Sequence, residues 1–282
     1  MGSPRLRFVS VPAAAYTSPN VIIRSNFSAA DATSGLTGWD ADYDSSTNGW
    51  TNVGNAALRQ AGFTRGVTGT GGVPKSVIGY DGQGPFSVSG HRVFRGWVGD
   101  GTNVVGDHLK ISWTGVSDVY YRFYVQYESG FGWTTKTHDK MCYGNQGGNY
   151  KILGFGFASH GNFFGISIST ENSGVNIDGA TMSWETFAAG GASTSDARWR
   201  LVECHHRMES SVGADDGVLE IWVDEVRLVN RTDITYTTAL SQIEFNANMT
   251  NPNCGGGYMY RSYAYPCVAD GYIGPYNATR GY

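Results

Sequence analysis

The sequence carries little charge, and its basic residues form no cluster. Only 16% of its 282 residues are Asp, Glu, Lys or Arg, and the formal net charge is -4. Binding to nucleic acid or to an anionic membrane relies on grouped Lys and Arg side chains that neutralise phosphates. We therefore expect neither nucleic acid nor a membrane to be a partner of this protein.

The sequence also lacks long apolar runs. No stretch approaches the roughly 18 apolar residues that a membrane-spanning helix needs. The start of the chain, MGSPRLRFVSVPAAAYTSPN, has no apolar core of the kind found in secretory signals. These absences predict a soluble protein without a signal peptide. We expect this protein to be located in a virion or outside the cell, which it would reach without export, for example by release on cell lysis.

Cysteine is scarce, which restricts metal and redox chemistry. Cys142, Cys204, Cys254 and Cys267 have no CxxC spacing and no matching histidine cluster, so neither a metal site nor a cofactor is predicted. Cys204 lies in an apolar segment and is predicted to be a buried small side chain. A disulfide between Cys254 and Cys267, and a structural calcium ion at the turn 215–217, are left open.

Glycine and aromatic residues are abundant, with 40 Gly, 17 Tyr and 8 Trp, and they favour short strands joined by tight turns. Segment 118–128 (DVYYRFYVQYE) shows the strand period most clearly, because successive side chains alternate across a pleat. The apolar face carries Val119, Tyr121, Phe123, Val125 and Tyr127. The polar face carries Tyr120, Arg122, Tyr124, Gln126 and Glu128.

Regular strands are predicted from about residue 91 onwards, with no helical period. Their ranges are 91–98, 107–114, 118–128, 150–158, 163–170, 180–187, 198–208, 217–229, 241–248 and 257–273. The spacing predicts an all-β, two-sheet antiparallel jelly-roll sandwich over residues 91–282. Residues 31–90 are predicted to be a loop-rich, aromatic-containing region packed on the sandwich. Residues 1–30 are predicted to be an extended, proline-broken arm that contacts other subunits of an oligomer.

Several segments in this order resemble a known family. They are YYRFYVQYESGFGW, HDKM, ARWRLVECHHRMESSVGADDGVLEIWVDEVRLV and GYIGPY. Together they resemble the concanavalin A-like lectin/glucanase jelly-roll superfamily, and within it the bacterial polysaccharide lyase-like branch. The resemblance covers roughly residues 91–275. It implies a sandwich fold and a polysaccharide partner, in a family that includes lectins, hydrolases, lyases and structural modules.

A lyase would neutralise a uronate carboxylate and remove the neighbouring proton, which suits Arg or Gln together with a Tyr or His base. Arg122, Tyr124, Gln126 and His205 would supply those groups if the protein is a lyase. As a carbohydrate-binding face we predict Arg122, Tyr124, Gln126, Glu203, His205 and Arg207. Trp199 and Trp222 are interpreted as core residues.

Two functions follow from these observations. The first is a non-catalytic structural protein with a carbohydrate-binding jelly roll, displayed on an extracellular assembly such as a bacteriophage virion, as a capsid decoration protein, head fibre or tail appendage. The second is a polysaccharide lyase that cleaves a uronate-containing glycan by β-elimination. The Gln-Ile-His and Lys-Ala-Gly patterns of one lyase branch are missing, so the first function is favoured.

Overall fold

The computed structural model describes residues 19–24, 27, 43–47, 50–53, 63–68, 77–79, 84–99, 106–128, 141–146, 149–155, 163–169, 174–183, 197–235, 238–246 and 259–280. The regular secondary structure of these residues consists of strands. No helix among them is long and apolar enough to cross a membrane. The predicted all-β class is confirmed.

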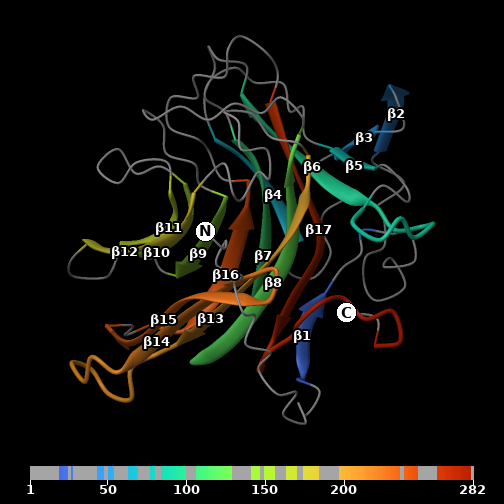
Figure 1. Cartoon of the computed structure of the whole chain (residues 1–282). Coiled ribbons are helices and arrows are strands. Elements are labelled where there is room, and N and C mark those ends of the chain that lie inside the picture. Colours follow the sequence, from blue (N-terminus) through green and yellow to red (C-terminus); the bar gives the residue numbers. More distant parts are fainter. Residues whose placement is uncertain are drawn as a thin grey trace, which may run out of the picture.

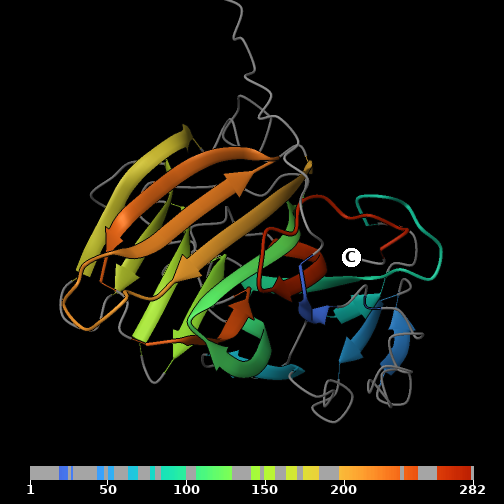
Figure 2. The ribbon, with the colours of Figure 1, turned by 90° about the horizontal axis from the view of Figure 1, so that it is seen from below.

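The described strands form two antiparallel sheets, which Figures 1 and 2 show packed face to face. Sheet A consists of β1 (Val21–Arg24), β2 (Tyr43–Thr47), β3 (Trp50–Val53), β5 (Val77–Gly79), β6 (Val93–Gly99), β8 (Asp118–Tyr127), β13 (Trp199–Arg207), β14 (Gly217–Val223), β15 (Val226–Ile234) and β17 (Met259–Ala269). Sheet B consists of β4 (Phe63–Thr68), β7 (Gly106–Val116), β9 (Cys142–Gln146), β10 (Asn149–Phe155), β11 (Phe163–Ser169), β12 (Gly174–Ser183) and β16 (Leu240–Phe245). This arrangement confirms the predicted antiparallel sandwich.

Strand order brings distant parts of the chain together. Sheet A runs β15-β14-β13-β8-β17-β6-β5-β3-β2, with β1 paired to β17, and sheet B runs β12-β11-β10-β9-β16-β7-β4. In Figures 1 and 2, β5, β3 and β2 extend sheet A to one side of the sandwich. The long strands β8, β13 and β17 therefore form the centre of sheet A.

The main core lies between the sheets, and β8 supplies one wall of it. Val119, Tyr121, Phe123, Val125 and Tyr127 are each at most 2% exposed. The ring of Phe123 packs edge-on against Phe245 of β16, with 5.0 Å between the ring centroids. This contact places the apolar face of β8 against sheet B, as the sequence period predicts.

The opposite face of β8, which we call the outer face of sheet A, is also largely covered. Residues 270–280, here called the C-terminal segment, run over it beside β1, and the two lie side by side in Figures 1 and 2. Asn20 donates its backbone N–H to Asp270 at 2.7 Å, and Arg24 donates to the carbonyl of Arg280 at 2.9 Å. Sheet A is thus sandwiched between sheet B and a thin layer of its own chain.

The N-terminal region differs from the prediction. Val21, Ile23 and Arg24 pair with β17 of the same chain, and Phe27 is completely buried. The expectation that residues 1–30 lie outside the sandwich is therefore wrong for 19–24 and 27, because an edge of β17 was available for pairing. The remaining arm residues lie outside the described part of the chain, so contacts to other subunits stay a prediction.

Two other regions are more regular than the sequence indicates. Residues 31–90 are predicted to be a loop-rich region packed on the sandwich, and their described segments add β2, β3 and β5 to sheet A and β4 to sheet B. The single strand predicted for 217–229 is two strands, because Asp224 and Glu225 form a turn with positive φ angles of 48° and 65°. Val223 and Val226 then face each other as the first pair of the β14–β15 hairpin.

Candidate functional site

Arg122 and Glu203 face each other across β8 and β13 on the outer face of sheet A. Each is only 1% exposed, because the C-terminal segment lies over them. Glu203 accepts the backbone N–H groups of Ile273 and Gly274 at 2.7 and 2.9 Å. Arg122 donates to the carbonyls of Gly274 and Tyr265 at 2.9 and 3.3 Å. This pair fastens the GYIGPY segment to the sheet.

Burial changes the acidity of Glu203. Loss of solvent raises the pKa of its carboxyl from 4.5 to about 7, although two backbone N–H groups and the charge of Arg122 act in the opposite direction. Desolvation is the largest of these effects because the side chain is almost fully enclosed. Glu203 can therefore gain a proton near neutral pH while it holds the C-terminal segment.

The other predicted residues on this face have different surroundings. Tyr124 is 7% exposed, and its hydroxyl accepts the backbone N–H of Tyr276 at 3.0 Å. Gln126 is half-buried and donates to the carbonyl of Ala197. Arg207 is exposed and donates to the carbonyl of Asp216 at 3.2 Å. The structure thus places Tyr124 with the Arg122–Glu203 pair, and Arg207 at the far end of β13.

Three partly exposed aromatic residues, Tyr120, Trp222 and Tyr272, lie together on the outer face of sheet A. Tyr120 and Trp222 are nearly parallel, with an interplanar angle of 30° and 6.4 Å between centroids. Trp222 meets Tyr272 of the C-terminal segment edge-on, with 5.3 Å between centroids. We call these three residues the outer aromatic cluster. Partly exposed aromatic rings of this kind offer flat apolar surfaces with polar edges to a ligand.

His205 lies beside this cluster, between two carboxylates. Its ring stacks on Tyr120, with a centroid distance of 4.0 Å and an interplanar angle of 6°. Nδ1 lies 2.8 Å from Oε2 of Glu220, and Nε2 lies 2.7 Å from Oδ1 of Asp118. The second oxygen of Glu220 accepts a hydrogen bond from Arg227 at 2.7 Å. The rings are therefore bordered by planar polar groups.

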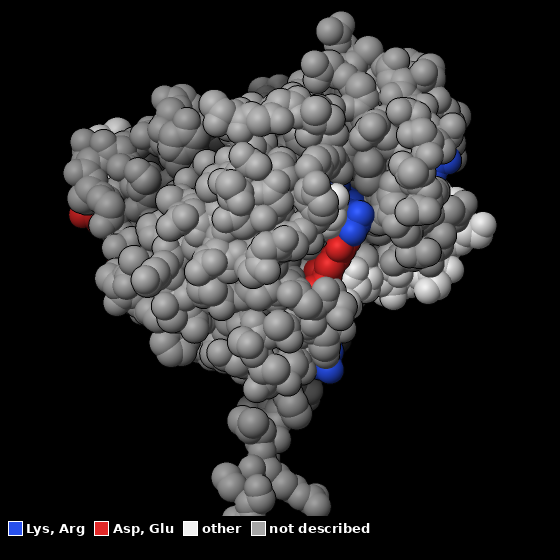
Figure 3. All heavy atoms as spheres, turned by 90° about the horizontal axis from the view of Figure 1, so that it is seen from above, with Lys and Arg blue, Asp and Glu red and all other residues white. Residues whose placement is uncertain are grey.

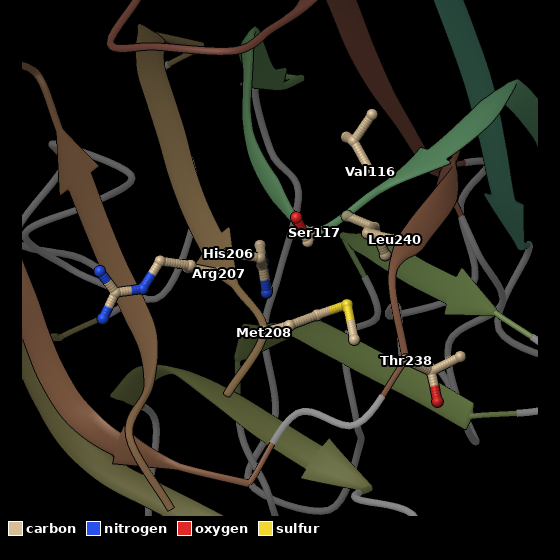
Figure 4. A pocket seen from close by; sticks show the side chains of 7 residues that line it. All are labelled: Val116, Ser117, His206, Arg207, Met208, Thr238 and Leu240. Atoms are coloured by element: carbon tan, nitrogen blue, oxygen red, sulfur yellow. The ribbon is translucent and has the colours of Figure 1, made fainter. Parts of the chain in front are cut away.

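The neighbouring His206 belongs to the other side of the sheet. Its ring stacks on Tyr121 in the main core, and the two side chains hydrogen bond at 3.1 Å. Together with Met208 and Leu240 it lines a small pocket where β7, β13 and β16 meet, and Figure 4 shows the guanidinium of Arg207 pointing away from it. Because His205 and His206 are adjacent in a strand, they face opposite sides of the sheet, and both rings are buried.

Among the described residues, no group of three or more His, Cys, Asp or Glu side chains is arranged so that it could hold a metal ion. Cys204 is fully buried, which confirms its predicted packing role. Cys267 is a free, buried thiol, and Cys254, the other member of the disulfide left open, lies outside the described residues. Next to the turn 215–217, where a calcium ion is left open, Glu209 accepts the backbone N–H groups of Gly213 and Asp215.

Charged side chains on the described surface form pairs of opposite sign. Arg95 pairs with Glu128, Arg200 with Asp224, and Arg231 with Asp233. Figure 3 shows basic and acidic side chains next to each other in a hollow of the face seen from above. This pairing provides no broad patch of a single charge on the described residues.

Sequence reasoning missed the outer aromatic cluster because it assigned Trp222 to the core. The alternation in β14 (GVLEIWV) contained the needed signal, since Leu219, Ile221 and Val223 form its buried face and leave Trp222 with Glu220 on the other. Tyr272 carried no such signal. It reaches the site because a distant pair of side chains fixes the C-terminal segment.

Comparison with solved structures identifies the fold. An alginate lyase (Aly36B) solved with an alginate trisaccharide aligns with a TM-score of 0.50 at 12% identity, over 73% of this chain and 97% of the lyase. An alginate lyase from a Chlorella virus aligns with a TM-score of 0.50 at 12% identity, over 89% and 99%. This chain has the jelly-roll sandwich fold of these structures. No protein-family model and no curated protein sequence matches it. The fold predicted from the sequence resemblance is confirmed, and the function of this jelly roll must be argued from its own residues.

Proposed function

We propose that this protein binds a polysaccharide through the outer aromatic cluster of its jelly roll, without cleaving it. The observation that carries the proposal is the grouping of Tyr120, Trp222 and Tyr272, partly exposed and bordered by His205 and Glu220. Aromatic rings pack against the apolar faces of sugar rings, while carboxylate groups accept hydrogen bonds from hydroxyls. Side chains of these types meet both needs of a glycan ligand.

The proposal moves the binding site away from part of the face predicted from sequence. Arg122 and Glu203 already hydrogen bond to the C-terminal segment, and a ligand would have to displace that segment to reach them. The hydroxyl of Tyr124 is engaged by the same segment. The rings of Tyr120, Trp222 and Tyr272 next to His205 stay partly exposed. The commitment of Arg122 and Tyr124 supports a binding role over a lyase that uses those two side chains.

We also propose that the protein works at a virion surface or in another extracellular assembly. Two features support this location: the polysaccharide ligand proposed above, and a proline-punctuated segment with Pro4, Pro12 and Pro19 that suits attachment to other subunits. Electron microscopy of purified particles with an antibody to this chain tests the location. Signal on free protein alone would contradict it.

Affinity electrophoresis in gels that contain single polysaccharides tests the binding function. We expect at least one polymer to retard the wild-type protein, and Trp222→Ala to lose that retardation while keeping the wild-type circular dichroism spectrum. Val226→Ala is the matched control, because this side chain is 48% exposed on the neighbouring strand. Retardation that persists in Trp222→Ala would remove the site from the outer aromatic cluster.

Incubation with alginate, glucuronan and pectin separates binding from the lyase alternative. β-Elimination creates an unsaturated uronate that absorbs ultraviolet light, and we expect none to accumulate. Sustained product formation that is lost in Tyr124→Phe or His205→Ala would establish a lyase and overturn the non-catalytic proposal.

A further inference from the structure

We infer that the outer aromatic cluster takes a neutral glycan and discriminates against polymers with carboxylate or sulfate groups. The inference rests on the proposed function, because it names the ligand class of that same site. It depends on which charges border the rings and on whether the nearby cations are available to an anionic sugar.

The groups next to the rings are mainly acidic. Asp118 has a side chain that is 49% exposed, and one of its oxygens contacts His205. Glu220 is 15% exposed and is shared between His205 and Arg227. Glu220 lies in the row of side chains that crosses the sheet through His205 and Tyr120, and Asp118 lies two residues before Tyr120 on the same face of β8. An anionic sugar lying over Tyr120 would thus meet two negative charges at close range.

The cations on this face already have partners. Arg122 lies beneath the C-terminal segment and donates to two backbone carbonyls. Arg227 is bound to Glu220, and Arg207 binds the carbonyl of Asp216 while standing opposite Asp118 in the strand register. Recognition of a sugar carboxylate favours an Arg with a free fork of donors. An anionic ligand would first have to break one of these contacts.

The electrostatic environment of Tyr120 agrees with this arrangement. The pKa of its hydroxyl is raised above the usual range, first by burial and then by the negative charges of Glu220, Asp118 and Glu203. Arg207 acts in the opposite direction and is the smallest of these influences. A field that disfavours a tyrosinate also disfavours a uronate placed over the same ring.

A neutral sugar has the opposite relation to these groups. Its hydroxyls can donate to the carboxylates of Asp118 and Glu220, and hydrogen bonds to charged acceptors are the stronger kind. Its apolar C–H face can lie on Trp222 and Tyr120, whose rings are within 30° of parallel. The same side chains therefore attract neutral sugars and repel acidic ones.

Matched polymers test the inference directly. A neutral glucan, mannan and galactan are each compared with the C6-oxidised form of the same polymer, in which some hydroxymethyl groups have become carboxylates. For the polymer that binds, we expect the neutral form to bind at least about tenfold tighter than its oxidised form at low salt. The reason is that like charges brought together cost more than 1.4 kcal/mol. Added salt should narrow this difference by improving binding of the oxidised form.

Variants assign the effect to the two carboxylates. Asp118→Asn and Glu220→Gln should each reduce the preference for the neutral polymer, and Asp233→Asn, an exposed carboxylate paired with Arg231, should not. Equal or tighter binding of the oxidised polymer that is lost in Trp222→Ala would overturn the inference and leave the binding function intact. If no polymer of either kind binds, the proposed function fails and the inference falls with it.

Discussion

At the scale of single residues, the buried pair Arg122–Glu203 has the largest consequences. Taking two charges out of water is expensive, so such a pair is retained only when geometry and hydrogen bonds compensate. Here four hydrogen bonds to Tyr265, Ile273 and Gly274 supply that compensation. The pair therefore sets where the C-terminal segment lies, and through it the position of Tyr272.

The raised pKa of Glu203 predicts a specific pH dependence of stability. A carboxyl whose pKa is about 7 when folded and 4.5 when unfolded binds its proton more tightly in the folded state. Its contribution is complete below about pH 4.5 and is lost as pH rises through 7, by on the order of 2–3 kcal/mol. Urea unfolding between these pH values should show this loss for the wild type, but not for Glu203→Gln. Parallel curves for the two proteins would contradict the assignment.

Removing both members of the pair should cost less than the two single losses added together. Arg122→Met leaves Glu203 and two carbonyls without their cationic partner, and we expect a loss of about 3–5 kcal/mol in the free energy of unfolding. The double variant Arg122→Met/Glu203→Leu should lose less than the sum of the two single variants, as measured by urea unfolding. Strict additivity would show that the two side chains act independently.

Sequence alone located Arg122, Glu203 and His205 on one face of the sheet, because alternation along β8 and β13 is a local property. It could not show that the first two are buried. Their cover comes from residues 273 and 274, which are about 70 positions from Glu203, and no periodic signal links them. The polar face of a strand looks the same in a sequence whether water or another segment lies over it.

At the scale of elements, the β14–β15 turn stores backbone strain. Asp224 and Glu225 both have positive φ angles, which non-glycine residues rarely adopt. Two-residue turns of this kind favour Asn-Gly or Asp-Gly. Glu225→Gly should therefore raise the free energy of unfolding by up to about 1 kcal/mol in urea unfolding. Glu225→Ala, which keeps a Cβ atom, should not reproduce the gain, and destabilisation by the glycine would contradict the turn geometry.

The N-terminal region that contains β1 and Phe27 is a second part of the fold whose role can be tested. Phe27 is completely buried, and a Phe→Ala change at such a site costs about 3–5 kcal/mol. Ile22, in the same region of the chain, is 38% exposed and serves as the control. Thermal unfolding should show a large fall in Tm for Phe27→Ala and a small one for Ile22→Ala. Equal effects would mean that this region is not integrated in the sandwich.

Proline spacing explains why β1 was predicted to be an arm. Pro4, Pro12 and Pro19 break the N-terminal sequence, and such segments commonly extend to a partner. The chain instead supplies its own acceptor, because β6 pairs only with Met259–Tyr263 of β17 and leaves the same edge of residues 267–269 for pairing with β1. Which edge an extended segment joins depends on the whole sheet and is not encoded locally.

At the scale of the whole molecule, the protein is a jelly roll in which one sheet is packed on both sides. The side toward sheet B is a continuous apolar core, and the other side carries smaller clusters under the C-terminal segment and β1. The outer aromatic cluster lies beside these buried clusters, and its three rings are partly exposed to solvent. The central claim is that a glycan binds there, and not on the opposite sheet.

Hydrogen exchange measured with and without a bound polysaccharide tests that claim most directly. With the polymer that retards the protein in affinity electrophoresis, we predict slower amide exchange in β8, in β14 and in residues 270–276, which carry Tyr120, Trp222 and Tyr272. Exchange in β9–β12 of sheet B should stay unchanged. Protection confined to β9–β12 would contradict the account and place the ligand on the other side of the sandwich.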